Sequence, residues 1–336
     1  MKRGTFGLLI ILLFVLSLFV SFRELQAAPY YEGKRITIIV GFGPGGGYDR
    51  MARLVAKYLP KYIPGKPSVI VENMEGASSI ICANHIYNLA KPDGLTLGTF
   101  NRGLPFAQIT KVDGVKFDVM KFSWVGSAAV ESTVFAIRSD LPYKTVDDLR
   151  RVKEPIPVAG MGPGTSDTQF AILLKEFAGV NLKLIIYPSS ADGMLAIERK
   201  EVDGRAGSYS SLKPFVERGV VRPLVRCRVS EPGTEDLPVN EDFTTDLKGK
   251  TIMAMLAAAD QIGRPYVAPP GTPAEVMNIL KDSFAKVSKD PDLKEDAKKN
   301  KMEVKYIPAD ECLKVVEYLI NQPADIVKEF SKYIKF

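Results

Sequence analysis

The sequence predicts an α/β protein made of two similar units, each a mostly parallel sheet flanked by helices. Continuous apolar runs such as 36–40 (ITIIV) alternate with stretches of helical periodicity such as 51–63. The alternation occurs twice along the chain, and 336 residues suit about two domains. A content of 46% hydrophobic and 25% charged residues is typical of globular proteins and excludes a disordered or fibrous chain.

The first unit begins with the strand at 36–40, whose apolar residues follow one another as in a strand covered on both faces. A glycine loop leads into the helix at 51–63. The Pro-Asp-Gly sequence at 92–94 predicts a turn. The other elements expected in this unit are strands at 68–71 and 95–100 and a helix at 79–89.

The same rhythm returns after residue 133. Thr145 is expected to cap a helix at 146–151, because its hydroxyl suits the first turn. Residues 230–251 are polar and rich in turn formers, so they predict a loop. The remaining elements expected are strands at 134–137, 157–159, 182–186, 204–207 and 220–225 and helices at 167–178, 192–199, 273–287, 291–299 and 309–334.

Residues 1–28 are typical of a cleaved secretory signal. Lys2 and Arg3 give a positive start, 7–20 is apolar, and Ala27–Ala28 supplies small residues for cleavage. The uncharged stretch is long enough to span a membrane, so an uncleaved anchor is the alternative. We expect cleavage and a periplasmic protein.

Composition argues against several kinds of function. The net charge is +6, and no block of Lys and Arg alternates with aromatic residues, so nucleic-acid binding is not expected. The only histidine, His85, falls within an expected helix and is interpreted as a packing residue. Cys82, Cys227 and Cys312 lie in apolar settings and are expected to be buried free thiols. We therefore expect neither a metal nor a catalytic centre.

The first glycine loop, residues 41–49 (GFGPGGGYD), joins a strand to a helix. Backbone N–H groups at such a junction point at a ligand, and the helix dipole favours an anion. Glycines let the ligand approach closely, and we expect Gly46 in particular to use a positive φ. The candidate ligand-binding residues here are Gly45, Gly46, Gly47, Tyr48 and Asp49.

A dinucleotide-binding enzyme is an alternative interpretation of this loop. Gly41, Gly43 and Gly46 match G-x-G-x-x-G, and Glu72 follows the next strand where a ribose-binding acid belongs. The export signal, Pro44 inside the motif and the single histidine oppose this alternative. A tight turn that binds nothing is the third interpretation.

A second glycine loop, residues 160–168 (GMGPGTSDT), also joins a strand to a helix, and Thr165 or Ser166 is expected to cap that helix. Hydroxyl side chains gather after other strands, at 126–133, 188–190 and 208–211, where ligands bind in open α/β sheets. Arg102, after the strand at 95–100, is the best cationic candidate. The candidates from these segments are Arg102, Ser127, Ser132, Gly164, Thr165, Ser166 and Ser208.

Several segments, taken in order, share the pattern of one family. They are 31–40, 44–49, 71–73 with 76–77, 90–94, 141–149, the loop 160–168, Tyr187 with Pro188, and 268–273. Together they resemble the substrate-binding receptors of tripartite tricarboxylate transporters, the Bug-type periplasmic proteins, over residues 30–335. Tyr187 is added to the candidate ligand-binding residues on this resemblance.

The resemblance implies a type II, Venus-flytrap-like binding protein without enzymatic activity or cofactor. Lobe 1 would comprise 29–130 plus 256–336, and lobe 2 would comprise 131–255. A small carboxylate would be held between the two glycine loops by N–H groups, hydroxyls and bridging waters. The receptor, expected to be a monomer, would deliver it to a large and a small membrane subunit of the transporter. An exported sensor for a membrane signalling protein is the alternative.

The sequence departs from the family pattern at two positions of the first loop. Gly43 replaces a proline, and Tyr48 stands near the usual small hydroxyl residue. The identity of the carboxylate therefore does not follow from the resemblance.

Overall fold

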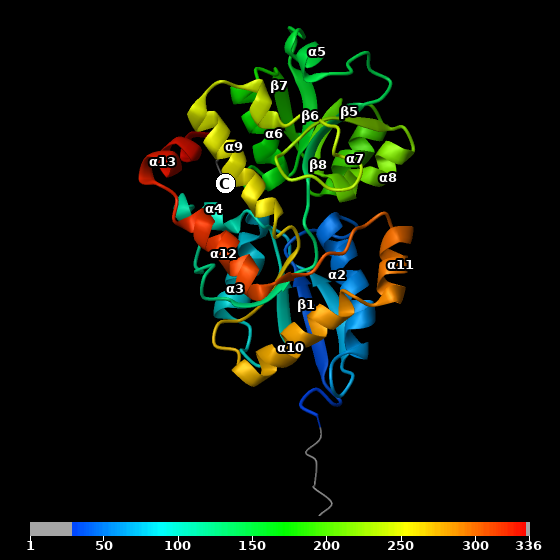
Figure 1. Cartoon of the computed structure of the whole chain (residues 1–336), viewed down its shortest axis with the longest axis vertical. Helices are drawn as coiled ribbons and strands as arrows, with labels where there is room; N and C mark the ends of the chain where they lie inside the picture. The colour runs from blue at the N-terminus through cyan, green and yellow to red at the C-terminus, as the bar shows by residue number, and fades with distance from the viewer. Residues whose placement is uncertain (1–28, 334–336) are drawn as a thin grey trace, which may run out of the picture.

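The computed structural model describes residues 29–333, so the predicted signal at 1–28 lies outside the described residues. Two α/β lobes are stacked along the long axis, each built on its own sheet (Figure 1). The α/β class and the two units are confirmed.

The lobe 1 sheet has six strands in the order β11-β4-β10-β3-β1-β2, and the lobe 2 sheet has five in the order β7-β6-β8-β5-β9. The lobe 1 strands are β1 Arg35–Val40, β2 Ser68–Asn73, β3 Thr96–Thr99, β4 Ser123–Ser127, β10 Pro265–Ala268 and β11 Ile307–Pro308. The lobe 2 strands are β5 Thr133–Arg138, β6 Ile156–Gly160, β7 Leu182–Ile186, β8 Gly204–Ser208 and β9 Val221–Arg226.

Helices cover both sheets. Those around the first sheet are α2 Gly47–Tyr58, α3 Ile80–Asn88, α4 Leu104–Ile109, α10 Ala274–Val287, α11 Pro291–Lys299 and α12 Ala309–Ile320. Those around the second are α5 Val146–Arg150, α6 Ser166–Phe177, α7 Ser190–Glu198, α8 Tyr209–Glu217, α9 Leu247–Asp260 and α13 Ala324–Tyr333. Short 3₁₀ turns are η1 Leu59–Lys61, η2 Ala77–Ser79 and η3 Asn240–Phe243.

Both sheets are mixed, whereas the sequence predicted mostly parallel ones. β1 runs parallel to β2 and β3, and β6 runs parallel to β7 and β8. β10 is antiparallel to β3 and β4, and β5 is antiparallel to β8 and β9. β11 is likewise antiparallel to β4. Apolar periodicity carries no information on strand direction.

The expectation for the first strand is confirmed. Ile36, Ile38 and Val40 pack into one core cluster, and Ile39 packs into the cluster on the opposite face of the sheet. Successive side chains of a strand point to opposite faces, so a strand covered on both sides needs an unbroken apolar run.

Several helices differ from the predictions, and α4 and α8 lie where no helix was expected. α2 begins at Gly47 rather than at residue 51, so the glycine loop is shorter than expected. α9 occupies part of the expected loop and of the residues beyond it, with Asp246 accepting the N–H of Lys248 at its N-terminus. The expected helix at 309–334 is two helices separated around Pro323, since proline lacks the N–H that a helix interior needs.

Over residues 29–333, the chain passes between the lobes three times. The third passage joins α12 to α13, and the first two are adjacent segments, 128–132 and 261–264. The N–H of Ala128 bonds to the carbonyl of Arg264, and the N–H of Glu131 bonds to that of Asp260, both at 2.9 Å. We call these two adjacent segments the crossing segments.

The C-terminal helix α13 lies beside α9 on lobe 2 (Figure 1). Its Phe330 is fully buried in the same core cluster as residues of α6 and α9. The lobe boundaries expected from the sequence stay a prediction.

The three cysteines are buried and free, as predicted. His85 is half-buried in α3. Within residues 29–333, no helix has the length and apolar character needed to cross a membrane, and no group of side chains suited to a metal ion is found.

Candidate functional site

A narrow cavity with about 30 Å³ of free space lies between the lobes, where the N-termini of four helices meet. α2 comes from lobe 1, and α6, α7 and α8 come from lobe 2. The lining residues are Phe42, Gly43, Gly46, Gly47, Tyr48, Asn101, Arg102, Met161, Thr165, Ser166, Asp167, Ser189, Ser190, Ser208, Ser211 and Arg264.

Two of the four helices begin without a side-chain cap. The N-cap residues of α2 and α8 are Gly46 and Ser208, and neither accepts a bond from the first turn. By contrast, Thr165 accepts the N–H of Thr168 in α6, and Ser189 caps α7 in the same way. In α8 the N–H of Tyr209 donates to the carbonyl of Ser132 at 2.8 Å, which leaves the N–H groups of Ser210 and Ser211 without a side-chain acceptor in the described part of the chain. The first N–H groups of α2 also lack one, and this arrangement suits an anion.

The conformation of the first glycine loop differs in detail from the expectation. Gly45, with φ +79°, uses the left-handed region, whereas Gly46 is extended with φ −74°. The N–H of Gly45 donates to Asp49 Oδ2 at 2.9 Å. The side chains of Arg53 and Asn73 also bond to this carboxylate. Asp49 thus shapes the loop and lies outside the cavity lining.

The pKa of Asp49 is lowered. Burial alone would raise it, but hydrogen bonds from Arg53, the Gly45 N–H and Asn73 outweigh burial. Its carboxylate therefore stays ionised and committed to these partners.

The lobes are closed on each other. Asn101 of lobe 1 donates its Nδ2 to the carbonyl of Gly164 in lobe 2 at 2.8 Å. On another side of the cavity, a Cβ built on Gly47 would lie 2.5 Å from Arg264 Nη2 and would overlap the hydroxyl of Ser211. Only glycine leaves room for this approach.

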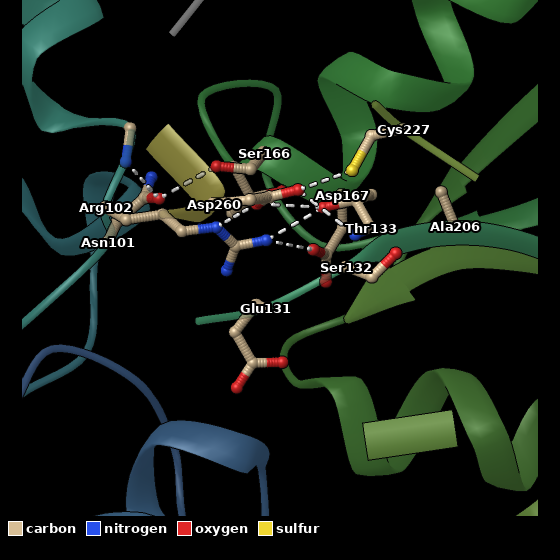
Figure 2. A network of polar contacts seen from close by, with 12 residues as sticks. Asn101, Arg102, Glu131, Ser132, Thr133, Ser166, Asp167, Ala206, Cys227 and Asp260 are labelled. Carbon is tan, nitrogen blue, oxygen red and sulfur yellow. Dashed lines mark hydrogen bonds and ion pairs between the residues drawn. The ribbon is translucent and has the colours of Figure 1, made fainter. Parts of the chain in front are cut away.

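Arg102 lines the cavity, but much of its guanidinium is bound to protein. It forms an ion pair through Nε with Asp260 and donates from Nη2 to Thr133 Oγ1 at 2.9 Å (Figure 2). Asp260 also accepts the N–H of Thr133 and the thiol of Cys227, both at 3.1 Å. Burial would lower the pKa of Arg102, but the charge of Asp260 raises it well above the ordinary arginine value. Arg102 thus connects lobe 1 to Asp260, next to a crossing segment.

Two further buried arginines complete the surroundings. Arg205 pairs with Asp167 at 3.0 Å. Arg264 pairs with Glu131 at 3.0 Å, and its guanidinium carbon lies 4.4 Å from the centre of the Tyr48 ring. Three buried ion pairs therefore surround the cavity, and their formal charges cancel.

Of the residues predicted from the sequence, the cavity brings together Gly46, Gly47, Tyr48, Arg102, Thr165, Ser166 and Ser208. Four others lie outside the lining and bond to groups of the protein. Ser127 accepts the N–H of Arg264, and Ser132 donates to the carbonyl of Val229. Gly164 gives its carbonyl to Asn101, and Asp49 supports its own loop. Gly45 also lies outside the lining, and Tyr187 lines a neighbouring groove.

Sequence reasoning did not propose the other lining residues as ligand contacts. Ser189, Ser190 and Ser211 lie in the hydroxyl clusters, so the signal was present for them. Arg264 lies between an unpredicted helix and a short strand, and no local pattern marks it. The remaining unproposed lining residues are Phe42, Gly43, Asn101, Met161 and Asp167.

Comparison with known proteins identifies the family. A family model described as "Tripartite tricarboxylate transporter family receptor" matches residues 51–331. The chain belongs to this family. Its members are substrate-binding receptors, which makes the protein a solute-binding receptor and not an enzyme. The resemblance stated from the sequence is confirmed.

Among curated relatives, a UPF0065 protein of Bordetella pertussis is 26% identical over 314 residues, 90% of this chain and 92% of the relative. Among solved structures, the periplasmic binding protein BugD matches with a TM-score of 0.74 at 22% identity, over 90% of this chain and 98% of BugD. A Rhodopseudomonas palustris protein with adipate matches with a TM-score of 0.72 at 20% identity, over 90% and 99% of the chains. MatC of the same organism, with bound malate, has a TM-score of 0.70 at 19% identity, over 88% and 99%. These likenesses confirm the two-lobed fold.

Proposed function

We propose that this protein is a periplasmic receptor that encloses a small carboxylate between its lobes and delivers it to the membrane subunits of a tripartite transporter. One observation carries the proposal: four helix N-termini from both lobes converge on one cavity, and two of them lack a side-chain cap. Each N-terminus carries about half a positive charge in its unsatisfied N–H groups.

The charges of the cavity favour an anion over other ligands. Arg102, Arg205 and Arg264 are each paired with a carboxylate, so the helix N-termini add an uncompensated positive potential. A cation would be repelled by that potential, and a neutral sugar would leave the oriented N–H groups without a charged acceptor.

Apolar groups form part of the wall. The rings of Phe42 and Tyr48 are stacked with centroids 4.7 Å apart, and Met161 lines the cavity on the lobe 2 side. These side chains suit the carbon skeleton of a short organic acid. The malate- and adipate-bound neighbours in the same fold support this class of ligand.

The dinucleotide alternative loses its support. Glu72, which it requires beside the ligand, is an exposed residue of β2 and does not line the cavity. This chain belongs to a family of receptors. The spacing of Gly41, Gly43 and Gly46 therefore needs no dinucleotide, because a tight turn from strand to helix also requires glycines.

A thermal-shift panel tests the proposal. The panel comprises mono-, di- and tricarboxylates, the methyl esters of the best acid, sugars, polyamines and NAD. A ligand that binds only the folded protein stabilises it by about 2.7 kcal/mol at a hundredfold excess over its Kd. We expect a shift of a few degrees with free acids and most of it lost with the esters. A largest shift with a sugar, a polyamine or NAD, or esters as effective as the acids, would overturn the proposal.

A further inference from the structure

The guanidinium of Arg264 occupies the place where both lobes and a crossing segment meet. Its side chain is 3% exposed and belongs to the cavity wall. Glu131 of the other crossing segment holds Nε at 3.0 Å, and the face of the Tyr48 ring lies 4.4 Å from the guanidinium carbon. The contacts come from different directions and fix the guanidinium before any ligand arrives.

Arg205 is fully occupied by protein acceptors. Its three nitrogens donate to the carbonyl of Ala206, the carbonyl of Ser190 and the carboxylate of Asp167. It does not line the cavity.

Some N–H groups of Arg264 have no good protein acceptor among the described residues. Its Nη2 has a long contact of 3.3 Å with Ser210 Oγ, and the hydroxyl of Ser210 already donates to Glu131 at 2.7 Å. Across residues 29–333, no hydrogen bond from Arg264 Nη1 to protein is found. Since the residue lines the cavity, these N–H groups are the ones that a ligand can use.

These N–H groups of Arg264 lie beside the N-termini of α2 and α8, the two helices without a side-chain cap. Both Nη2 of Arg264 and the hydroxyl of Ser211 lie against the Cα of Gly47, where a Cβ would overlap them. Gly47 is in the first turn of α2, and Ser211 is in the first turn of α8. A formal positive charge therefore converges there with the first N–H groups of α2 and with those of Ser210 and Ser211 in α8, beyond Tyr209, whose N–H donates to the carbonyl of Ser132.

The N-terminus of α6, beside Asn101, is a separate position in the same cavity. Thr165 caps it and Arg205 neutralises Asp167 in its first turn, so the N–H groups of Ser166 and Asp167 are the donors left for a carboxylate.

We propose that Arg264 is a specificity-determining residue that selects ligands with a second anionic group. One carboxylate lies at the N-terminus of α6, and the second lies between Arg264 and the N-termini of α2 and α8. A ligand with one carboxylate leaves the buried guanidinium without its acceptor, which is a larger loss than a missing neutral contact. This inference rests on the proposed function and deepens it.

The test compares acids of equal length that differ in one charge. The probes are the α,ω-dicarboxylates from malonate to adipate and the matching monocarboxylates, titrated by calorimetry into protein refolded to remove bound ligand. We expect the best dicarboxylate to bind wild type at least about 10-fold more tightly than its monocarboxylate, since a hydrogen bond to a charged group is worth about that factor or more.

The variants are designed around the Arg264–Glu131 pair. Arg264→Met alone leaves the carboxylate of Glu131 buried without its cation. The double variant Arg264→Met/Glu131→Gln, which also removes that charge, is therefore measured as well. A matched control removes an outer pair in the same way, Arg228→Met/Glu241→Gln, whose arginine side chain is 64% exposed. In the Arg264 variants, dicarboxylate affinity should fall about 10- to 100-fold while monocarboxylate affinity changes less than about threefold. The control should bind both acids as wild type does.

Three results separate the hypotheses. Wild-type dicarboxylate affinity in a folded Arg264→Met/Glu131→Gln protein overturns the inference and leaves the receptor proposal intact. Equal losses for both acids also overturn it, because Arg264 would then only support the closed form. A wild-type protein that binds no acid of the series contradicts the proposed function itself.

Discussion

Replacing Gly47 by alanine should weaken ligand binding without weakening the fold. Gly47 is the first residue of α2, and the added Cβ would lie 2.5 Å from Arg264 Nη2 and overlap the hydroxyl of Ser211. Those two groups belong to a crossing segment and to lobe 2. The methyl group therefore conflicts with the closed arrangement of the lobes and not with the packing inside lobe 1.

The magnitude follows from the overlap. Forcing one extra methyl group into a packed contact costs about 1–3 kcal/mol. Since about 1.4 kcal/mol corresponds to a tenfold change, the Kd should rise about 5- to 150-fold. Alanine is also a better helix former than glycine by about 0.8–1.0 kcal/mol, so the stability of the ligand-free protein should not fall.

Gly46→Ala is the matched control. Its Cβ would lie 3.7 Å from Ser190 Oγ and 3.8 Å from the carbonyl of Gly43, which are ordinary contacts, and its φ of −74° suits any residue. We expect its Kd to stay within about threefold of wild type, a change under about 0.7 kcal/mol.

Calorimetric titration with the best acid of the panel measures both variants, and urea unfolding without ligand measures stability. A Kd for Gly47→Ala equal to that of wild type would refute the close approach of the lobes at this point. Equal losses in both variants would show that the loop responds to any added methyl group.

Three predictions concern stability. Arg102→Met leaves Asp260 buried without its cation and should lower the free energy of unfolding by about 3–5 kcal/mol; the double variant with Asp260→Asn should recover most of this in urea titrations, and an undiminished loss would contradict the pairing. Burial and the charge of Glu131 raise the pKa of Glu231 from 4.5 to about 9. The folded protein then holds a proton that the unfolded chain releases, so unfolding free energy should fall with rising pH between these values, by at most about 1.4 kcal/mol per unit. Glu231→Gln should flatten this dependence, and an unchanged slope would assign it to other groups. Asp290→Ala removes the cap of α11 and should cost about 1–2 kcal/mol in thermal unfolding with no change in acid binding, whereas a fall in affinity would contradict its remoteness from the cavity.

The sequence was sufficient for the elements whose signal is local. The run at Arg35–Val40 is apolar because helices cover both faces of its sheet, and Thr145 caps α5 through the predicted hydroxyl bond to Asp148. α9 was missed because it is buried on several sides, so its apolar residues, from Ile252 to Ala259, show no single stripe. Strand direction was missed because the spacing of apolar residues is the same in parallel and antiparallel strands.

The cavity could be predicted only in part, because only some of its residues are marked by a local sequence pattern. The two glycine loops are recognisable from their composition, and residues of both line the cavity. Arg264 and its partner Glu131 come from distant parts of the chain, and only the pairing of the crossing segments brings them together. Ser127 and Ser132 have the composition of ligand contacts, but their hydroxyls bond within and next to the crossing segments.

Crystals grown with the best-binding acid of the panel would show where the ligand lies. We expect the acid inside the cavity between the lobes, with its carboxylate oxygens within hydrogen-bond distance of N–H groups in the first turns of α2, α6 or α8. An acid bound outside this cavity, or one whose carboxylates point away from those helix N-termini, would contradict the proposed function.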